Sequence, residues 1–140
     1  MARKDLIHDA VVASLQRAGW DITHDPLQLT FEDRPLAIDL GAELISAERG
    51  EQKIAVEIKS FLNNSSVADF HVALGQYINC RIALAKLDPG RTLFLAVSQT
   101  AFDDFFVSRF AQTVMLETQM NLIVCDIDRE EIIQWTEHKS

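Results

Sequence analysis

The chain has 140 residues, of which 48% are hydrophobic and 24% charged, which is typical of one globular domain covering residues 1–140 and argues against a largely disordered chain. Its formal net charge of −8 argues against a protein that coats nucleic acid through bulk electrostatics. The apolar runs are too short to cross a bilayer, and Cys80 and Cys125 stand in neither metal-binding nor redox spacing. We therefore expect a cytoplasmic protein with reduced thiols and no membrane partner.

Hydrophobic periodicity predicts one amphipathic helix and then a run of strands in the first part of the chain. Apolar residues recur at helical spacing over 3–18, and Gly19 ends that helix. Apolar and polar residues then alternate in short stretches separated by turn residues such as Asp25-Pro26. The expected strands cover 20–23, 27–31, 36–40, 44–47 and 53–60. We expect consecutive strands among them to form a meander, with a hairpin in its middle.

Helices and strands alternate in the second half of the chain. Ser66 followed by Asp69 resembles a helix-capping pair. A long helix is therefore expected to run to about Leu87, where the Asp88-Pro89-Gly90 turn ends it. The later elements are expected as a buried strand over 92–97, helical segments within 98–120, and strands over 121–126 and 130–135. This order favours an α/β fold around a mixed sheet, with the 92–97 strand beside the 53–60 strand.

Three polar residues in the strand region are the first candidates for a functional site. Asp39 lies between apolar neighbours, where aspartate is disfavoured in a strand, although it can also cap the Gly41 turn. Glu57 and Lys59 alternate with apolar residues and so share one side of their strand, where they can also form a simple exposed ion pair. Two carboxylates from adjacent strands with a lysine beside them supply what metal-assisted phosphodiester hydrolysis requires. The expected cofactor is Mg²⁺ (or Mn²⁺), held by Asp39, Glu57 and the backbone carbonyl of Ile58.

The long second helix offers a further candidate in Gln76. Its amide falls at helical spacing on a face with the small residues Ala73, Cys80 and Ala83. A buried amide needs hydrogen-bond partners, so Gln76 is either part of a site or packed against the sheet and satisfied locally. Both interpretations stay open from the sequence.

The arrangement of Asp39, Glu57 and Lys59 after an amphipathic helix and before a further helix and strand resembles the PD-(D/E)xK nuclease superfamily. This resemblance implies a three-layer α/β/α restriction-endonuclease-like core with a central mixed β-sheet and the three residues in the catalytic motif. Ile38 stands in place of the motif's proline. Gln76 resembles the helix glutamine of the RecB-like and resolvase-like branches.

Many members of that superfamily also carry an acidic residue on the first helix, upstream of an aromatic residue that follows glycine. Here Gly19-Trp20 fits, and the corresponding helix position is occupied by His8. A neutral histidine can ligate a metal, but Mg²⁺ prefers oxygen, so His8 departs from the pattern. The resemblance implies a supporting role for His8 in the site.

Specific strings along essentially the whole chain carry a closer resemblance: Ala2-Arg3-Lys4-Asp5 with His8, Gly19-Trp20, Thr23-His24-Asp25-Pro26, Ile38-Asp39-Leu40-Gly41-Ala42-Glu43, Ile54-Ala55-Val56-Glu57-Ile58-Lys59-Ser60-Phe61 and Ala73-Leu74-Gly75-Gln76-Tyr77. In these strings the chain resembles the fdxN element excision controlling factor XisH family. This resemblance implies a role in programmed excision of a DNA element during heterocyst differentiation in cyanobacteria. The implied partners are a separate site-specific recombinase and the companion factor XisI, with DNA and a second copy of the chain as further candidates.

Three functional hypotheses follow, and whether the chain is an enzyme stays open among them. The first is an accessory factor of excision that keeps a Mg²⁺-dependent phosphodiesterase site. The second is a non-catalytic module that docks on the recombinase or XisI through its acidic C-terminal third. Residues 1–91 hold ten Lys/Arg against thirteen Asp/Glu, net −3, whereas residues 92–140 hold three against eight, net −5. The third is a free-standing Mg²⁺-dependent restriction or repair endonuclease.

Overall fold

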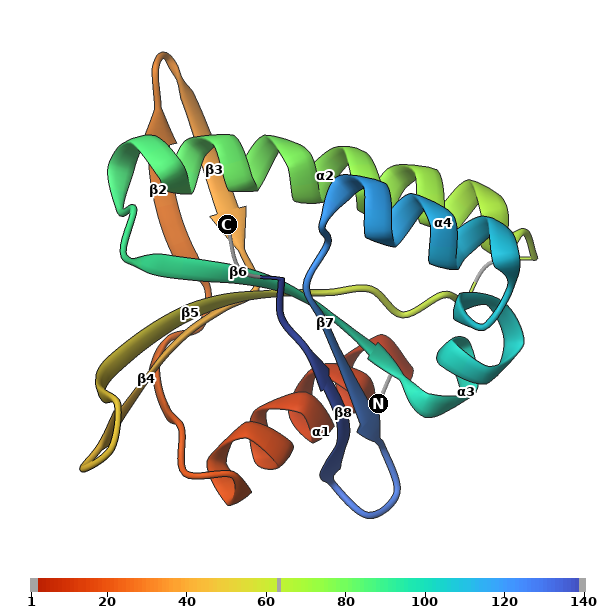
Figure 1. Ribbon diagram of the computed structural model, residues 1–140, viewed down its shortest axis with the longest axis horizontal. Coiled ribbons are helices and arrows are strands. Elements are labelled where there is room, and N and C mark those ends of the chain that lie inside the picture. The colour runs from red at the N-terminus through yellow and green to blue at the C-terminus, as the bar shows by residue number, and fades with distance from the viewer. Residues whose placement is uncertain (1–2, 63, 139–140) are drawn as a thin grey trace.

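The computed structural model describes residues 3–62 and 64–138, and within them a twisted six-stranded sheet carries helices on both faces (Figure 1). Its strands are β1 Asp21–His24, β4 Leu40–Ser46, β5 Gly50–Ile58, β6 Arg91–Ser98, β7 Leu122–Asp126 and β8 Glu131–Thr136. They lie in the order β1-β4-β5-β6-β7-β8. Strands β5, β6 and β7 are parallel, whereas β1, β4 and β8 are antiparallel to their neighbours. The expected central mixed sheet, with the predicted 92–97 and 53–60 strands side by side, is therefore confirmed.

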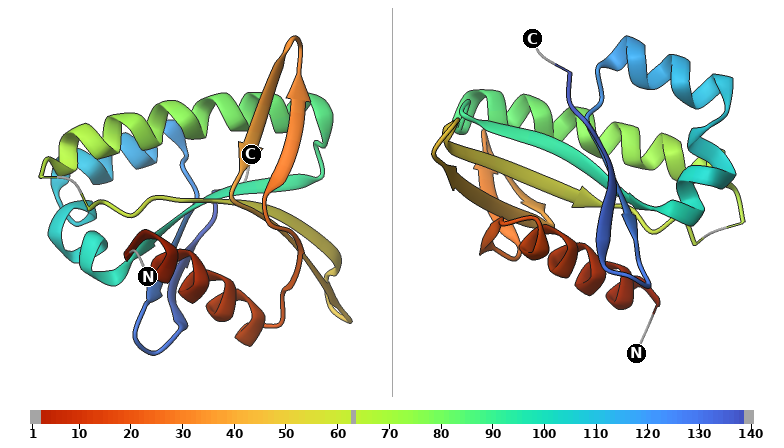
Figure 2. Two further views of the ribbon diagram at one scale, coloured as in Figure 1. Left: turned by 180° about the vertical axis from the view of Figure 1, so that it is seen from behind. Right: turned by 60° about the horizontal axis from the view of Figure 1, so that its bottom comes forward.

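The helices complete a three-layer α/β/α arrangement. Helices α2 (Ser66–Leu87) and α4 (Arg109–Thr118) lie on one face of the sheet, and α1 (Arg3–Arg17) lies on the other (Figures 1 and 2). Each face has its own buried apolar cluster, as the alternating side chains of the strands require. A short helix α3 (Gln99–Ala101) and a π-helix η1 (Phe102–Phe106) connect β6 to α4. No helix in the described part of the chain is long and apolar enough to span a membrane.

The predicted hairpin forms, but it does not belong to the main sheet. Strands β2 (Leu27–Phe31) and β3 (Arg34–Ile38) pair only with each other and project beside α2 (Figure 1). The expected single meander is therefore wrong, because β4 pairs with β1 instead of β3. Leu27 and Ile38 face each other at the base of the hairpin and are buried in the cluster beneath α2. Burial of these two side chains anchors the hairpin on the face of the sheet that α2 covers.

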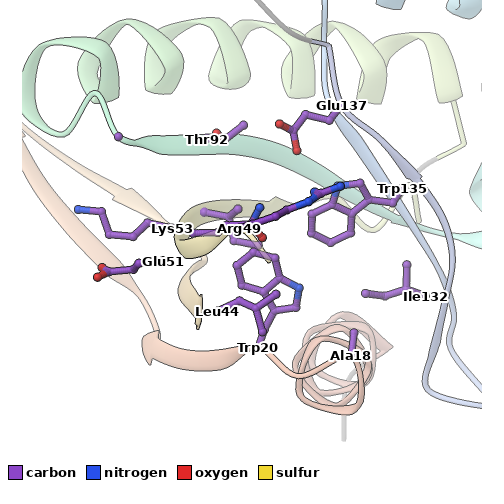
Figure 3. A pocket seen from close by; sticks show the side chains of 13 residues that line it. Ala18, Trp20, Leu44, Arg49, Glu51, Lys53, Thr92, Ile132, Trp135 and Glu137 are labelled. Carbon is purple, nitrogen blue, oxygen red and sulfur yellow. The ribbon is translucent and has the colours of Figure 1, made fainter. Parts of the chain in front are cut away.

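Two tryptophans join the segment that follows α1 to the last strand. The rings of Trp20 and Trp135 stack at 5.7 Å between centroids and 11° between planes. Trp135 also lies 4.6 Å from the ring of Phe94 on β6. Both indoles border a cavity of about 570 Å³, and the side chain of Arg49 extends from the β4–β5 turn across it toward Trp135 (Figure 3). Trp135 thus packs the end of the α1 region against the sheet.

Helix α2 and its N-cap lie one residue earlier than predicted. Ser65, not Ser66, is the N-cap, and its hydroxyl accepts a hydrogen bond from the backbone N–H of Ala68. Tyr77 is fully buried on the sheet-facing side of the helix. Its hydroxyl donates to the Leu93 carbonyl at 3.0 Å and accepts from the Asn121 N–H at 3.0 Å. One hydroxyl therefore joins α2 to the beginnings of β6 and β7.

The Tyr77→Phe substitution is expected to lower the free energy of unfolding by about 1 to 3 kcal/mol. The variant keeps the ring but leaves the buried Asn121 N–H without its acceptor, whereas the Leu93 carbonyl still accepts from the Asn121 side chain. Urea denaturation at one pH measures the difference. A loss well below 0.5 kcal/mol would show that this hydroxyl contributes little.

Candidate functional site

Asp39 occupies the break between β3 and β4, not a strand as predicted. Strand β4 begins with Leu40 paired to Val56 of β5, and this register brings Asp39 level with Glu57. The Asp39 Oδ2 atom accepts a hydrogen bond of 2.7 Å from the backbone N–H of Ile58. The carboxylate thus bonds to the neighbouring strand instead of capping the Gly41 turn.

Glu57 meets Asp39 at the end of β5. Burial, a side-chain hydrogen bond with Asp39 and the negative charge of Asp39 together raise the pKa of Glu57 to about 9, although the charge of Lys59 opposes this shift. At neutral pH the Glu57 carboxyl therefore keeps its proton. If both carboxyl groups ionise, their negative charges repel each other. A divalent cation bound between them would offset that repulsion.

Lys59 follows directly after β5 and remains bonded to the sheet through its backbone. Its N–H donates to the Ala96 carbonyl at 3.1 Å. Glu57 and Lys59 are both half-buried, which differs from the alternative of a simple ion pair on an exposed face. The lysine is held beside the carboxyls by the same strand that carries Glu57.

A cavity of about 470 Å³ joins these residues to the two helix residues named from the sequence. The structure thus brings all of the predicted site residues to one place, where their role in chemistry stays a prediction. The lining residues are His8, Asp39, Glu57, Ile58, Lys59, Ser60, Leu62 and Gln76.

Gln76 lines this cavity from α2 as an exposed residue. The amide is therefore not packed against the sheet, and Tyr77 takes the buried position beside it. One turn along, the thiol of Cys80 lies 4.0 Å from the Glu57 carboxyl. Burial, followed by the charges of Glu57 and Asp39, raises the pKa of Cys80 to about 11, so the thiol stays protonated beside the carboxyl pair.

His8 lines the cavity from α1 and is bonded to a residue outside the cavity lining that the sequence did not suggest. Its Nε2 atom lies 2.9 Å from Oδ1 of Asp25, in the turn between β1 and β2. From the sequence, Asp25 looked like a turn former because proline follows it. The only hint in the sequence was that two polar residues, His24 and Asp25, stand together before the hairpin. That hint does not reveal the contact of Asp25 with His8, which lies 17 positions away.

The donor set suits a hard divalent cation with few protein ligands. Among the described residues, no three Asp, Glu, His or Cys side chains converge closely enough to hold a metal by themselves. Mg²⁺ is commonly bound by one or two carboxylates and completes its shell with water and substrate phosphate. Asp39 and Glu57 fit that requirement, with the Ile58 carbonyl as the predicted third oxygen.

Comparisons with known proteins point to one family. The family model described as XisH protein matches residues 1–133, whereas a comparison with curated protein sequences finds no match. A crystal structure of an XisH family protein from Nostoc punctiforme PCC 73102 is 40% identical, with a TM-score of 0.87 over 95% of this chain and 100% of that one. A crystal structure of a fdxN element excision controlling factor protein from Anabaena variabilis is 42% identical, with a TM-score of 0.87 over 95% and 99% of the two chains. The chain therefore belongs to the XisH family.

Proposed function

We propose that this protein is an excision-control factor that acts on DNA through a Mg²⁺- or Mn²⁺-dependent phosphodiesterase site on a nuclease-like scaffold. Membership of the XisH family, and the similarity to a fdxN element excision controlling factor, support the role in excision control. The observation that carries the chemical part is that the Asp39 and Glu57 carboxyl groups lie level on neighbouring strands and line one cavity together with Lys59.

Several cavity residues have a role in this proposal that follows from their position. Asp39 and Glu57 would hold the cation, which when bound would activate water and neutralise charge on the scissile phosphate. The bond from the Ile58 N–H fixes the orientation of the Asp39 carboxylate. Lys59 stabilises the negative charge that develops on phosphate oxygens, and the exposed Gln76 amide binds the DNA backbone.

The experiment is cleavage of supercoiled and branched DNA in Mg²⁺ or Mn²⁺ by the wild type, Glu57→Ala and Lys59→Ala. We expect cleavage by the wild type and loss to background in both variants. Glu51→Ala is the matched control, because Glu51 lies on the same strand but outside the cavity. Cleavage that survives in both Glu57→Ala and Lys59→Ala would refute the catalytic assignment.

Metal binding is measured separately by thermal unfolding. A ligand that binds only the folded protein raises the free energy of unfolding by RT ln(1 + [L]/Kd). Mn²⁺ is therefore expected to raise the melting temperature of the wild type and leave that of Glu57→Ala unchanged. A wild-type protein that shows no shift in millimolar Mn²⁺ lacks the proposed metal site.

The acidic surface near the β7–β8 turn favours a second function, as a docking module for the recombinase or XisI. A cavity of about 660 Å³ beside the carboxyl site is lined by Asp103, Asp104, Asp126 and Asp128 among others. Such a surface repels DNA and attracts a basic protein partner. A homodimer through another face is compatible with either function.

Asp128 and Glu130 are the positions at which to test that docking surface. Asp126 is unsuitable, because its Oδ1 atom accepts hydrogen bonds from the backbone N–H groups of Asp128 and Arg129 and so holds the turn. Co-purification with XisI or the recombinase that is lost in Asp128→Lys with Glu130→Lys, but kept in Glu57→Ala, would support docking. Retention of the partner by the charge-reversed variant would argue against this surface.

A further inference from the structure

One polar pair, of which His8 lines the cavity, does not belong to the carboxyl site and has no role so far. His8 lies in the second turn of α1 and lines the cavity with Asp39 and Glu57. Its side chain is 29% exposed, and that of its partner Asp25 is 46% exposed. The two side chains are joined by a contact of 2.9 Å between Nε2 and Oδ1.

The contact with Asp25 decides which ring nitrogen carries hydrogen. An ionised carboxylate only accepts hydrogen bonds, so the Nε2 atom must be the donor. Neutral His8 therefore has its lone pair on Nδ1. No hydrogen bond to Nδ1 occurs within the described residues. The pair thus presents a free basic nitrogen of fixed tautomer.

The other polar groups of the cavity are poor proton acceptors. The Lys59 ammonium donates hydrogen bonds and accepts none. Glu57 already carries a proton, Asp39 accepts a hydrogen bond from the Ile58 N–H, and both are the expected cation ligands. The Gln76 amide and the Ser60 hydroxyl are too weakly basic to take a proton from water.

The structure favours a position for His8 next to the metal site over a role as one of the metal ligands. Among the described side chains, none forms a three-membered ligand group with the two carboxyls. A histidine that faces the same cavity without joining the ligands is placed to contact a water molecule there. That is the position which a general base occupies.

We propose that His8 is the general base of the phosphodiester hydrolysis and that Asp25 is its positioning residue. This inference rests on the proposed phosphodiesterase function. The oxygen of a water molecule forms a bond to phosphorus while its proton passes to His8 Nδ1. The bond from phosphorus to the leaving oxygen breaks, its electron pair stays on that oxygen, and a solvent proton neutralises it.

Three variants separate this role from a merely structural one. His8→Gln keeps a donor for Asp25 but lacks a basic nitrogen, and His8→Ala leaves space for added imidazole. Asp25→Asn can donate to Nε2 and so favours the opposite tautomer. Asp9→Asn is the control, because Asp9 is an exposed acid on the same helix that does not line the cavity.

We expect His8→Gln, His8→Ala and Asp25→Asn to cleave about 10²-fold or more slowly than the wild type in Mg²⁺. The Mn²⁺-induced thermal shift and the affinity for uncleaved DNA should match those of the wild type. Added imidazole should restore cleavage in His8→Ala but not in Asp25→Asn. Asp9→Asn should behave as the wild type.

Wild-type rates in His8→Gln or Asp25→Asn would overturn the inference while leaving the carboxyl site intact. Loss of the Mn²⁺ shift in His8→Ala would also overturn it, because His8 would then be a ligand. A failure of imidazole to restore any cleavage in His8→Ala would reduce His8 to a structural residue. If the wild type cleaves no DNA while it binds Mn²⁺, the proposed phosphodiesterase function fails and this inference fails with it.

Discussion

Glu57→Gln is expected to be more stable than the wild type by about 1 to 3 kcal/mol at pH 8 without metal, and about equally stable near pH 4. In the folded protein, burial and the neighbouring Asp39 raise the pKa of Glu57 to about 9, from an ordinary value of 4.5. Between these values the folded state binds more protons than the unfolded state, so the stability of the wild type falls as pH rises. Glutamine has no proton to lose, and its amide can donate to Asp39 as the protonated acid does.

Urea denaturation in EDTA at several pH values measures this effect as the difference between the wild type and the variant. Glu51→Gln serves as the control, since Glu51 is an exposed residue on the same strand. The two curves should diverge steadily from about pH 5 upward for Glu57→Gln and run parallel for Glu51→Gln. Parallel curves for both variants would mean that Glu57 ionises freely and that the carboxyl pair is not strongly coupled.

Trp135→Ala is expected to cost about 3 to 5 kcal/mol of stability, the usual range for the loss of a large aromatic side chain from a packed site. The change removes both the stack on Trp20 and the contact with Phe94, and it enlarges a cavity that already lies beside the ring. The melting temperature should fall by roughly 10 °C or more for a domain of this size.

The matched control for Trp135→Ala is Ile133→Ala on the same strand. Ile133 is 45% exposed, so truncation there should cost well under half as much. Differential scanning calorimetry of the two variants checks the comparison. Equal losses would show that the tryptophan contacts add little beyond those of an ordinary side chain on β8.

The local pattern of the sequence predicts most elements correctly, because period and turn residues act over short distances. The helix over 3–18, the long helix to Leu87 and the buried 92–97 strand all form close to the expected positions. The pairing of the hairpin is mispredicted for a different reason. Whether β3 or β1 lies beside β4 depends on the burial of Leu27 and Ile38 under α2, which is a tertiary contact.

The candidate site divides in the same way. Asp39, Glu57 and Lys59 stand out in the sequence because their residue types conflict with a simple core strand, and the structure brings them together. Asp25 gives no such signal, since an aspartate before proline is an ordinary turn residue. The contact of Asp25 with His8 joins the first helix to a turn 17 residues later, and no local sequence pattern predicts a contact over that separation.

The separate hairpin positions two carboxyl groups, one at each end of its base. Asp25 stands just before β2 and Asp39 just after β3, and the pairing of Leu27 with Ile38 closes the base between them. Residues inserted in register at the tip, near Glu32 and Asp33, would lengthen the projecting arm without moving that base. The length and surface of the arm can therefore change while Asp25 and Asp39 at its two ends keep their spacing.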